Sequence, residues 1–215
     1  MSYNKKDVIT AISIMIFIIT FAITFTVFFK PLYYSDVYRL GIDISSGIDI
    51  DTIKDNYDIL IQYQSIFYRG SLELPDFVMS TGGRIHFEEV KRIFEVIQML
   101  LIVSSISSVI CIYQRWKQKE YRFLRLSSIL TIVIPSIVGV IAMVNFNQAF
   151  IIFHKLFFRN DYWVFDARTD PIISILPQTF FMHCFLMIIG IVLLLSGGCY
   201  LVYRRKQKQI LFNNR

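Results

Sequence analysis

The sequence predicts an integral membrane protein that is mainly α-helical, with four transmembrane helices beneath an extracellular α+β cap. Of the 215 residues, 55% are hydrophobic and 16% are aromatic. The apolar residues gather in four stretches of about 20 residues, the length that a helix needs to cross a hydrocarbon core. Basic residues cluster at one end of these stretches and indicate the orientation. We therefore expect residues 1–215 to form a single integral membrane domain.

The expected spans cover residues 8–32, 93–113, 126–145 and 179–203. The first follows Lys5 and Lys6, as the apolar part of a secretory signal would. However, its apolar run is longer than about 20 residues and ends near Pro31 without the small-residue pattern of a cleavage site. We expect this helix to be retained as a membrane anchor.

The connecting segments differ in charge. The connector 114–125 carries five basic residues against Glu120, and the tail 204–215 carries five against none. The segment 33–90 has ten acidic and four basic residues, a net charge of −6. Because short cytoplasmic loops collect Lys and Arg, both termini are expected in the cytoplasm, with 33–90 and 146–178 outside as the cap. The total charge of +6 thus reports topology, and no nucleic-acid partner is expected.

Local sequence patterns in the two cap segments predict the secondary structure of the cap. Alternation of Ile and Asp at 42–44 and 48–51 predicts half-exposed strands, joined by a turn at residues 45–47. Gly82 and Gly83 are expected to end an element, and the second membrane helix is expected to start near His86. The third span is expected to continue as an amphipathic segment through His154 to Asp170-Pro171, before Pro177 introduces the fourth.

Three histidines are the candidate chemical groups. His86 precedes Glu89 by three residues, so on a helix the carboxylate could orient the imidazole. His154 lies among aromatic residues and one turn from Arg159, Asn160 and Asp161, and ionisable groups at membrane depth often mark sites. His183 lacks acidic neighbours in sequence and is interpreted as a packing or interface residue.

Structural alternatives exist for both stretches. "HFEEVK" also suits an interfacial helix start with acidic residues favoured by the helix dipole, and the aromatic residues suit an anchoring belt. The three cysteines, Cys111, Cys184 and Cys199, show no disulfide or metal spacing, and neither H-E-x-x-H nor G-x-S-x-G occurs. Acid-base catalysis by histidine, without a metal or another cofactor, is the chemistry that these residues leave.

The same two stretches resemble the lipoprotein intramolecular transacylase (Lit) family, integral membrane proteins of Gram-positive bacteria. "FHKLFFRNDYWVFDARTDPIISILPQTFF", residues 153–181, is similar to the family's pattern of His, a Phe-rich turn, Asn-Asp, Trp, an Asp-containing segment and Pro-x-x-Phe-Phe. "HFEEVK", residues 86–91, is similar to its His-x-x-acid-Val-Lys segment. With the four spans, the resemblance covers essentially the whole chain.

The resemblance implies a reaction and a set of site residues. The family moves the sn-2 acyl chain of a diacylglyceryl-modified lipoprotein onto the α-amino group of its N-terminal cysteine, giving a lyso-form lipoprotein. His86 and His154 would be catalytic, at the boundary between cap and outer membrane surface. Supporting or substrate-binding roles would fall to Glu89, Phe157, Phe158, Asn160, Asp161, Tyr162 and Trp163. Membrane lipid would surround the substrate.

Two rival interpretations remain. The first is a non-catalytic membrane sensor or partner-binding subunit that docks another protein through the Asp-rich stretch 43–58. The second is an outward-facing lipid acyltransferase or esterase with a different acyl donor. Replacing each histidine by alanine or asparagine and following the lipoprotein products by mass spectrometry would separate the first from the transacylase. The fate of a purified diacylglyceryl lipopeptide would separate the second.

Overall fold

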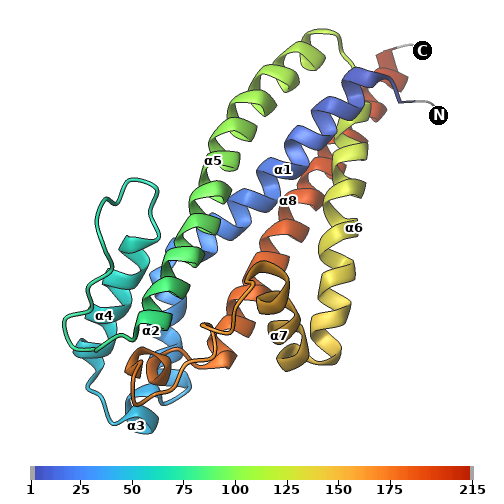
Figure 1. Ribbon diagram of the computed structural model, residues 1–215. Helices are drawn as coiled ribbons and strands as arrows, with labels where there is room; N and C mark the ends of the chain where they lie inside the picture. Colours follow the sequence, from blue (N-terminus) through green and yellow to red (C-terminus); the bar gives the residue numbers. More distant parts are fainter. Residues whose placement is uncertain (1–2, 214–215) are drawn as a thin grey trace. The chain divides into compact units, whose positions relative to one another are not determined.

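The computed structural model describes residues 3–213, apart from the side chains at helix positions 134, 138, 141, 143 and 213. The long helices are α1 (Lys5–Phe28), α5 (Thr81–Lys117), α6 (Arg122–Val144) and α8 (Gln178–Asn213). The shorter elements are α2 (Lys30–Arg39), α3 (Ile42–Ser46), α4 (Ile50–Tyr63), α7 (Phe146–Phe157) and the 3-10 helix η1 (Pro171–Ile175) (Figure 1). The prediction of a mainly helical protein is confirmed.

The long helices link two compact units. Unit 1 contains the chain up to Ile23, Ile97–Val140, and the chain from Met187 onward. Unit 2 contains Thr24–Val96 and Ile141–Leu186. Each long helix contributes one part to unit 1 and the other part to unit 2. The short helices all belong to unit 2, which also contains all three histidines.

Three of the described helices are long and apolar enough to cross a membrane: α1, α5 and α8 through Phe212. They contain the expected spans 93–113 and 179–203 and most of 8–32. The expected span 126–145 falls almost entirely within α6, and its passage through the membrane stays a prediction. Helix α5 has 37 residues and is about 55 Å long at 1.5 Å per residue, so it is longer than the thickness of a hydrocarbon core, about 30 Å.

The first span ends earlier than expected. Helix α1 stops at Phe28, and α2 restarts at Lys30 with Pro31 in its first turn. Proline lacks a backbone N–H and its ring clashes with the carbonyl four residues earlier, so it breaks a helix interior but is accepted in a first turn. Pro31 thus accounts for a break where the sequence predicted continuous helix.

The strands expected in the cap are wrong. Within residues 3–213 no strand occurs, and the 42–51 stretch forms α3 and the start of α4. The turn between them is correctly placed, because Gly47 follows α3 with φ +70° and Asp49 caps α4 by accepting a hydrogen bond from the Thr52 backbone N–H at 2.9 Å. Alternation over three or four residues was too short to distinguish a strand from the end of one helix and the start of the next.

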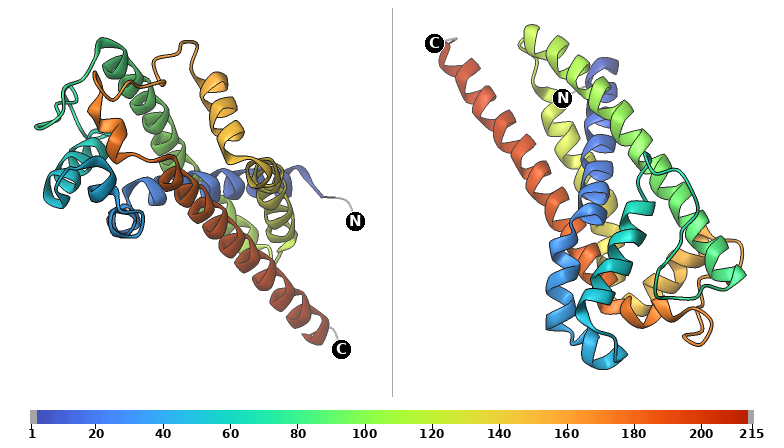
Figure 2. Two further views of the ribbon diagram at one scale, coloured as in Figure 1. Left: turned by 90° about the horizontal axis from the view of Figure 1, so that it is seen from below. Right: turned by 90° about the vertical axis from the view of Figure 1, so that its left-hand side faces the viewer.

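The core of unit 2 holds α2, α4 and η1 together around stacked aromatic rings. The rings of Tyr33 and Tyr57 stack with centroids 3.6 Å apart, and Phe180 meets Tyr33 edge-on at 5.0 Å. The Tyr33 hydroxyl donates to the backbone carbonyl of Ile175 at 2.7 Å, which ties α2 to η1. The views agree that α2, α3, α4 and the chain around η1 lie side by side (Figure 2). This packing forms the scaffold that carries the ends of α5 and α8 in unit 2.

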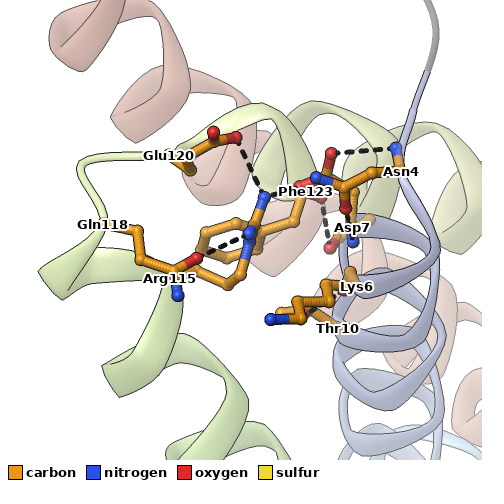
Figure 3. A network of polar contacts seen from close by, with 9 residues as sticks. Asn4, Lys6, Asp7, Thr10, Arg115, Gln118, Glu120 and Phe123 are labelled. Atoms are coloured by element: carbon orange, nitrogen blue, oxygen red, sulfur yellow. Dashed lines mark hydrogen bonds and ion pairs between the residues drawn. The ribbon is translucent and has the colours of Figure 1, made fainter.

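Unit 1 contains a buried ion pair between α1 and the end of α5. Asp7 is 1% exposed and Arg115 is 4% exposed, and their side chains form a charge-assisted hydrogen bond (Figure 3). Arg115 also donates to Glu120 at 3.0 Å and to Gln118 at 2.9 Å. One of the basic residues assigned to the cytoplasmic connector is therefore neutralised inside the protein, where an unpaired charge would be costly.

Candidate active site

The structure brings His86 and His154 together. His86 lies in the second turn of α5 and His154 near the end of α7, and their ring centroids are 5.9 Å apart with an interplanar angle of 34°. Both side chains are buried, at 5% and 8% exposure. The two histidines are 68 positions apart in the sequence, and unit 2 contains both of them. The two imidazoles are therefore close enough to act on neighbouring atoms of one molecule.

Aromatic rings surround the histidine pair. Phe158 meets His86 edge-on at 4.7 Å between centroids and also contacts His154 at 5.6 Å. Trp163 stacks on His154 at 4.7 Å, and Phe165 meets His86 at 5.5 Å. Three of the surrounding rings come from the segment that follows α7, so the chain turns back over the pair immediately after His154. The result is an imidazole pair inside an aromatic enclosure.

The tautomer of His154 follows from its hydrogen bond. Its Nδ1 lies 2.7 Å from the backbone carbonyl of Phe150, and a carbonyl can only accept, so Nδ1 carries the proton. A neutral ring then has a free lone pair on Nε2. Burial lowers the pKa of His154 below its ordinary value of 6.5, while the bond to Phe150 opposes that effect. His154 is thus a neutral imidazole that can accept a proton at Nε2.

Two buried polar atoms of this cluster have no hydrogen-bond partner among the described residues. They are Nδ1 of His86 and Nε1 of Trp163. Buried polar atoms are normally paired, because an unpaired one costs the free energy of its lost hydration. Both atoms belong to rings that enclose His154, so the cluster retains capacity to bind polar atoms of a ligand.

Glu89 does not orient His86, contrary to one expectation. Its two carboxylate oxygens accept hydrogen bonds from Nδ2 of Asn160 at 2.9 and 3.2 Å. Asn160 in turn accepts from the Tyr162 backbone N–H at 3.1 Å. The spacing of three residues correctly placed Glu89 on the same side of α5 as His86. Its hydrogen-bond partner, however, is Asn160 in the loop after α7. Glu89 and Asn160 therefore fasten that loop to α5.

The other predicted supporting residues divide into two groups. Phe158 and Trp163 contact the histidines, as described above. Phe157, Asp161 and Tyr162 are exposed, and Phe157 is 52% exposed. The structure does not bring these three into contact with either imidazole, although Tyr162 lies beside the first turn of α5.

Three residues of unit 2 make contacts that the sequence did not indicate. Phe165 contacts His86, and its signal was only its place in the aromatic run after His154. Asp170 is 3% exposed and bonds to the start of α5. Asp36, 1% exposed, lies with one carboxylate oxygen 2.7 Å from Nδ1 of His183. No local pattern indicates these last two contacts, because they join residues 90 and 147 positions apart. Within residues 3–213, no group of His, Cys, Asp and Glu is arranged to hold a metal ion.

Long apolar helices together with a buried imidazole pair define an integral membrane protein with a candidate acid-base site. The model of the family "Lipoprotein intramolecular transacylase Lit" matches residues 8–181. A solved structure of the membrane integral lipoprotein intramolecular transacylase Lit from Bacillus cereus is 41% identical, with 96% of each chain covered and a TM-score of 0.94. This chain belongs to the lipoprotein intramolecular transacylase family and is an acyltransferase.

Two variant structures of the Bacillus cereus protein are also similar. One has a histidine replaced by arginine and the other a histidine replaced by alanine. Each is 40% identical with a TM-score of 0.87, covering 97% and 96% of this chain and 93% and 94% of the other. A comparison with curated proteins found no match. Membership in a family of enzymes excludes the interpretation as a non-catalytic sensor.

Proposed function

We propose that this protein moves the sn-2 acyl chain of a diacylglyceryl-modified lipoprotein to the α-amino group of its N-terminal cysteine, giving the lyso-form lipoprotein. The observation that carries the proposal is the buried pair of imidazoles, 5.9 Å apart between centroids. The Bacillus cereus relative is a lipoprotein intramolecular transacylase, which supports the same reaction here.

The reaction balances within one substrate molecule. The amine nitrogen attacks the carbonyl carbon of the sn-2 ester, so an N–C bond forms and a tetrahedral intermediate results. The ester C–O bond then breaks, and the proton lost by the nitrogen is gained by the glyceryl oxygen. Such a transfer needs a proton acceptor, a proton donor and close positioning, and no nucleophile from the enzyme.

The two histidines divide these tasks in our proposal. His154 accepts the proton of the attacking amine at Nε2, because its Nδ1–H is already committed to the Phe150 carbonyl. His86 takes that proton from His154 and passes it to the departing glyceryl oxygen, so neither imidazole gains or loses a proton over the cycle. The short separation between the rings suits a proton that leaves one part of the substrate and returns to another.

The aromatic enclosure would protect the reaction from water. Hydrolysis of the same ester would release a free fatty acid, and an apolar wall that excludes water disfavours this outcome. Phe158, Trp163 and Phe165 supply that wall around the imidazoles. The unpaired Nε1–H of Trp163 can donate to an oxygen of the bound substrate.

The membrane topology belongs to the same proposal. Four helices cross the membrane, both termini are cytoplasmic, and the histidine pair faces the outer membrane-water interface. Support comes from the basic connector 114–125 and the basic tail 204–215, set against the acidic segment 33–90. A substrate with acyl chains in lipid and a peptide outside could then present its ester and amine together.

A product assay tests the proposal. Purified protein in detergent is incubated with a synthetic diacylglyceryl lipopeptide as the single substrate. Because substrate and lyso-form are isomers, the intact mass stays constant, so the product is identified by fragmentation in the mass spectrometer and by loss of reactivity toward an amine-specific label. We expect an N-acylated lyso-form from the wild type and from Lys155→Gln, a matched control at an exposed position beside His154.

Other products would contradict the proposal. Free fatty acid would indicate an esterase, and acyl transfer to added phospholipid or to a second peptide would indicate an intermolecular acyltransferase. An unchanged substrate, with wild-type protein that is monodisperse in detergent, would also contradict it.

A further inference from the structure

Asp170 lies against the first turn of α5, although it follows that turn by 90 residues in the chain. One oxygen of its carboxylate, Oδ1, accepts a hydrogen bond from the Ser80 backbone N–H at 2.8 Å. The hydroxyl of Ser80 accepts from the Gly83 backbone N–H at 2.9 Å, which makes Ser80 the N-cap of α5. The second oxygen of Asp170 accepts from the Thr169 hydroxyl at 2.8 Å. The buried carboxylate is thus fully engaged at the start of this helix.

This arrangement completes a capping box with a residue from another segment. In a capping box, a Ser or Thr caps the backbone three residues later, and a Glu or Gln at that third position accepts from the N–H of the capping residue. Here the third position is Gly83, which has no side chain, and Asp170 supplies the carboxylate instead. A negative charge at a helix N-terminus is also favoured by the helix dipole.

The two glycines in the first turn of α5 make room for the loop between α7 and η1. A Cβ added to Gly83 would overlap Oδ1 of Asp170 and would lie 3.1 Å from a ring carbon of Phe165. A Cβ on Gly82 would lie 3.0 Å from a ring carbon of Tyr162. The sequence suggested that Gly82 and Gly83 end an element. They instead lie in the first turn of α5 and form its contact surface for the loop.

The contact at Asp170 is one of two described hydrogen-bonded contacts that join the loop between α7 and η1 to α5. At the other end, Asn160 bonds to Glu89. Between these two points the loop contributes Trp163, which stacks on His154, and Phe165, which contacts His86. His86 itself follows Ser80 by six residues on the same helix. A shift of the first turn of α5 relative to the loop would therefore move His86 relative to Trp163 and His154.

We propose that Asp170, seated against Gly83, is a positioning residue that acts through the first turn of α5 to fix His86 against His154. Asp170 touches neither imidazole and takes no part in proton transfer. This proposal rests on the proposed transacylase function, because its consequence is the rate of the acyl transfer. Loss of the carboxylate leaves the Ser80 N–H unpaired and releases one of the two fastenings.

Substitutions of Asp170 test the proposal. In folded protein, Asp170→Ala should lower kcat by about tenfold to a hundredfold with little change in KM, because a displacement of about 1 Å in the reacting groups has effects of this size. Asp170→Asn should restore most of kcat, since its amide oxygen can still accept from Ser80 and its amide N–H can donate to Thr169. Asp55→Ala, at an exposed acidic position on α4, is the matched control and should match the wild type. Unchanged kcat in Asp170→Ala, or an equal loss in Asp170→Asn, would overturn the proposal.

Gly83→Ala supplies a second test that does not remove the carboxylate. Its methyl group should displace Asp170 and lower kcat, whereas the same change should cost little more when Asp170 is already Ala. Gly190→Ala, where an added Cβ meets open space, controls for the general effect of replacing a helical glycine. Additive losses from Gly83→Ala and Asp170→Ala would show that glycine and carboxylate act separately, which the proposal excludes.

Hydrogen exchange separates failure of this inference from failure of the proposed function. The backbone amides of Ser80, Gly83 and Arg84 should exchange faster in Asp170→Ala than in Asp170→Asn, whether or not the protein acts on lipopeptides. Faster exchange together with an inactive wild type would contradict the proposed transacylase function, but it would support the contact between Asp170 and the first turn of α5. Unchanged exchange would refute the positioning role even in an active enzyme.

Discussion

Nδ1 of His154 donates a hydrogen bond to the backbone carbonyl of Phe150, one turn earlier in α7, over a distance of 2.7 Å. The bond fixes the ring orientation and assigns the proton to Nδ1, so Nε2 is the atom that can accept a proton from a substrate. A short helix thereby prepares a histidine for use as a base by means of its own backbone.

The first prediction concerns pH. Burial lowers the pKa of His154, and a base with a lowered pKa keeps its lone pair to a lower pH. In the proposed reaction, the protonation of His154 should therefore lower kcat/KM only below pH 6.5, separately from the titration of the substrate's α-amino group, whose ordinary pKa is about 7.7–8.0. The measurement is a pH-rate profile with lipopeptide at concentrations below KM. An acid limb centred at or above 6.5 that is additional to the titration of the substrate amine and is lost in His154→Asn would contradict the assignment of a buried, neutral base.

The second prediction concerns the histidines themselves. Substitution of either His86 or His154 by Asn should lower kcat by about 10²–10⁴, the usual contribution of general acid-base catalysis. Because the two rings share one proton path in the proposal, the double variant should be little worse than the more damaged single variant. Lys155→Gln is the control, and fully additive losses would show that the histidines act independently.

The third prediction concerns the buried ion pair in unit 1. Arg115→Ala leaves the Asp7 carboxylate buried without its partner and should lower the stability of the protein by about 3 kcal/mol. The midpoint of thermal unfolding in detergent reports this loss. Arg168→Ala removes an ion pair at the surface, where the Arg168 side chain is 89% exposed, and should leave the midpoint essentially unchanged. Equal effects of both substitutions would contradict a structural role for burial at Asp7.

The fourth prediction separates His183 from the proposed reaction. His183→Ala leaves Asp36, 1% exposed, without the ring that contacts its carboxylate, so the unfolding midpoint should fall. The kcat of the folded variant should match that of the wild type, because the described contacts of His183 do not include His86 or His154. A large fall in kcat at unchanged KM would contradict this separation of His183 from the reaction.

The helices could be predicted from the sequence because a bilayer imposes a strong and simple requirement. A span must present about 20 apolar residues, and the apolar runs met this requirement at three helices that the structure confirms as long and apolar enough. His154 could also be identified from the sequence as a candidate site residue, because a histidine with polar neighbours is unusual within an aromatic run. The family resemblance then singled out His86 as its partner.

Contacts between distant segments could not be predicted in the same way. Glu89 has the same spacing from His86 whether it orients the imidazole or binds Asn160, and only the course of the loop after α7 decides between them. The partners of Asp170 and His183 lie 90 and 147 positions away, beyond any local pattern. The error at 42–51 has a different cause, because a few alternating residues fit both a strand and the ends of two helices.

The most direct test of the proposed reaction is a crossover experiment. A light lipopeptide is mixed with one that carries heavy isotopes in both its peptide and its sn-2 acyl chain, and the lyso-form products are fragmented in the mass spectrometer. Intramolecular transfer predicts that heavy peptides carry only heavy N-linked chains and light peptides only light ones, with product formed at least about a hundredfold more slowly by the His154→Asn variant. Products that combine a heavy peptide with a light chain would contradict the central claim.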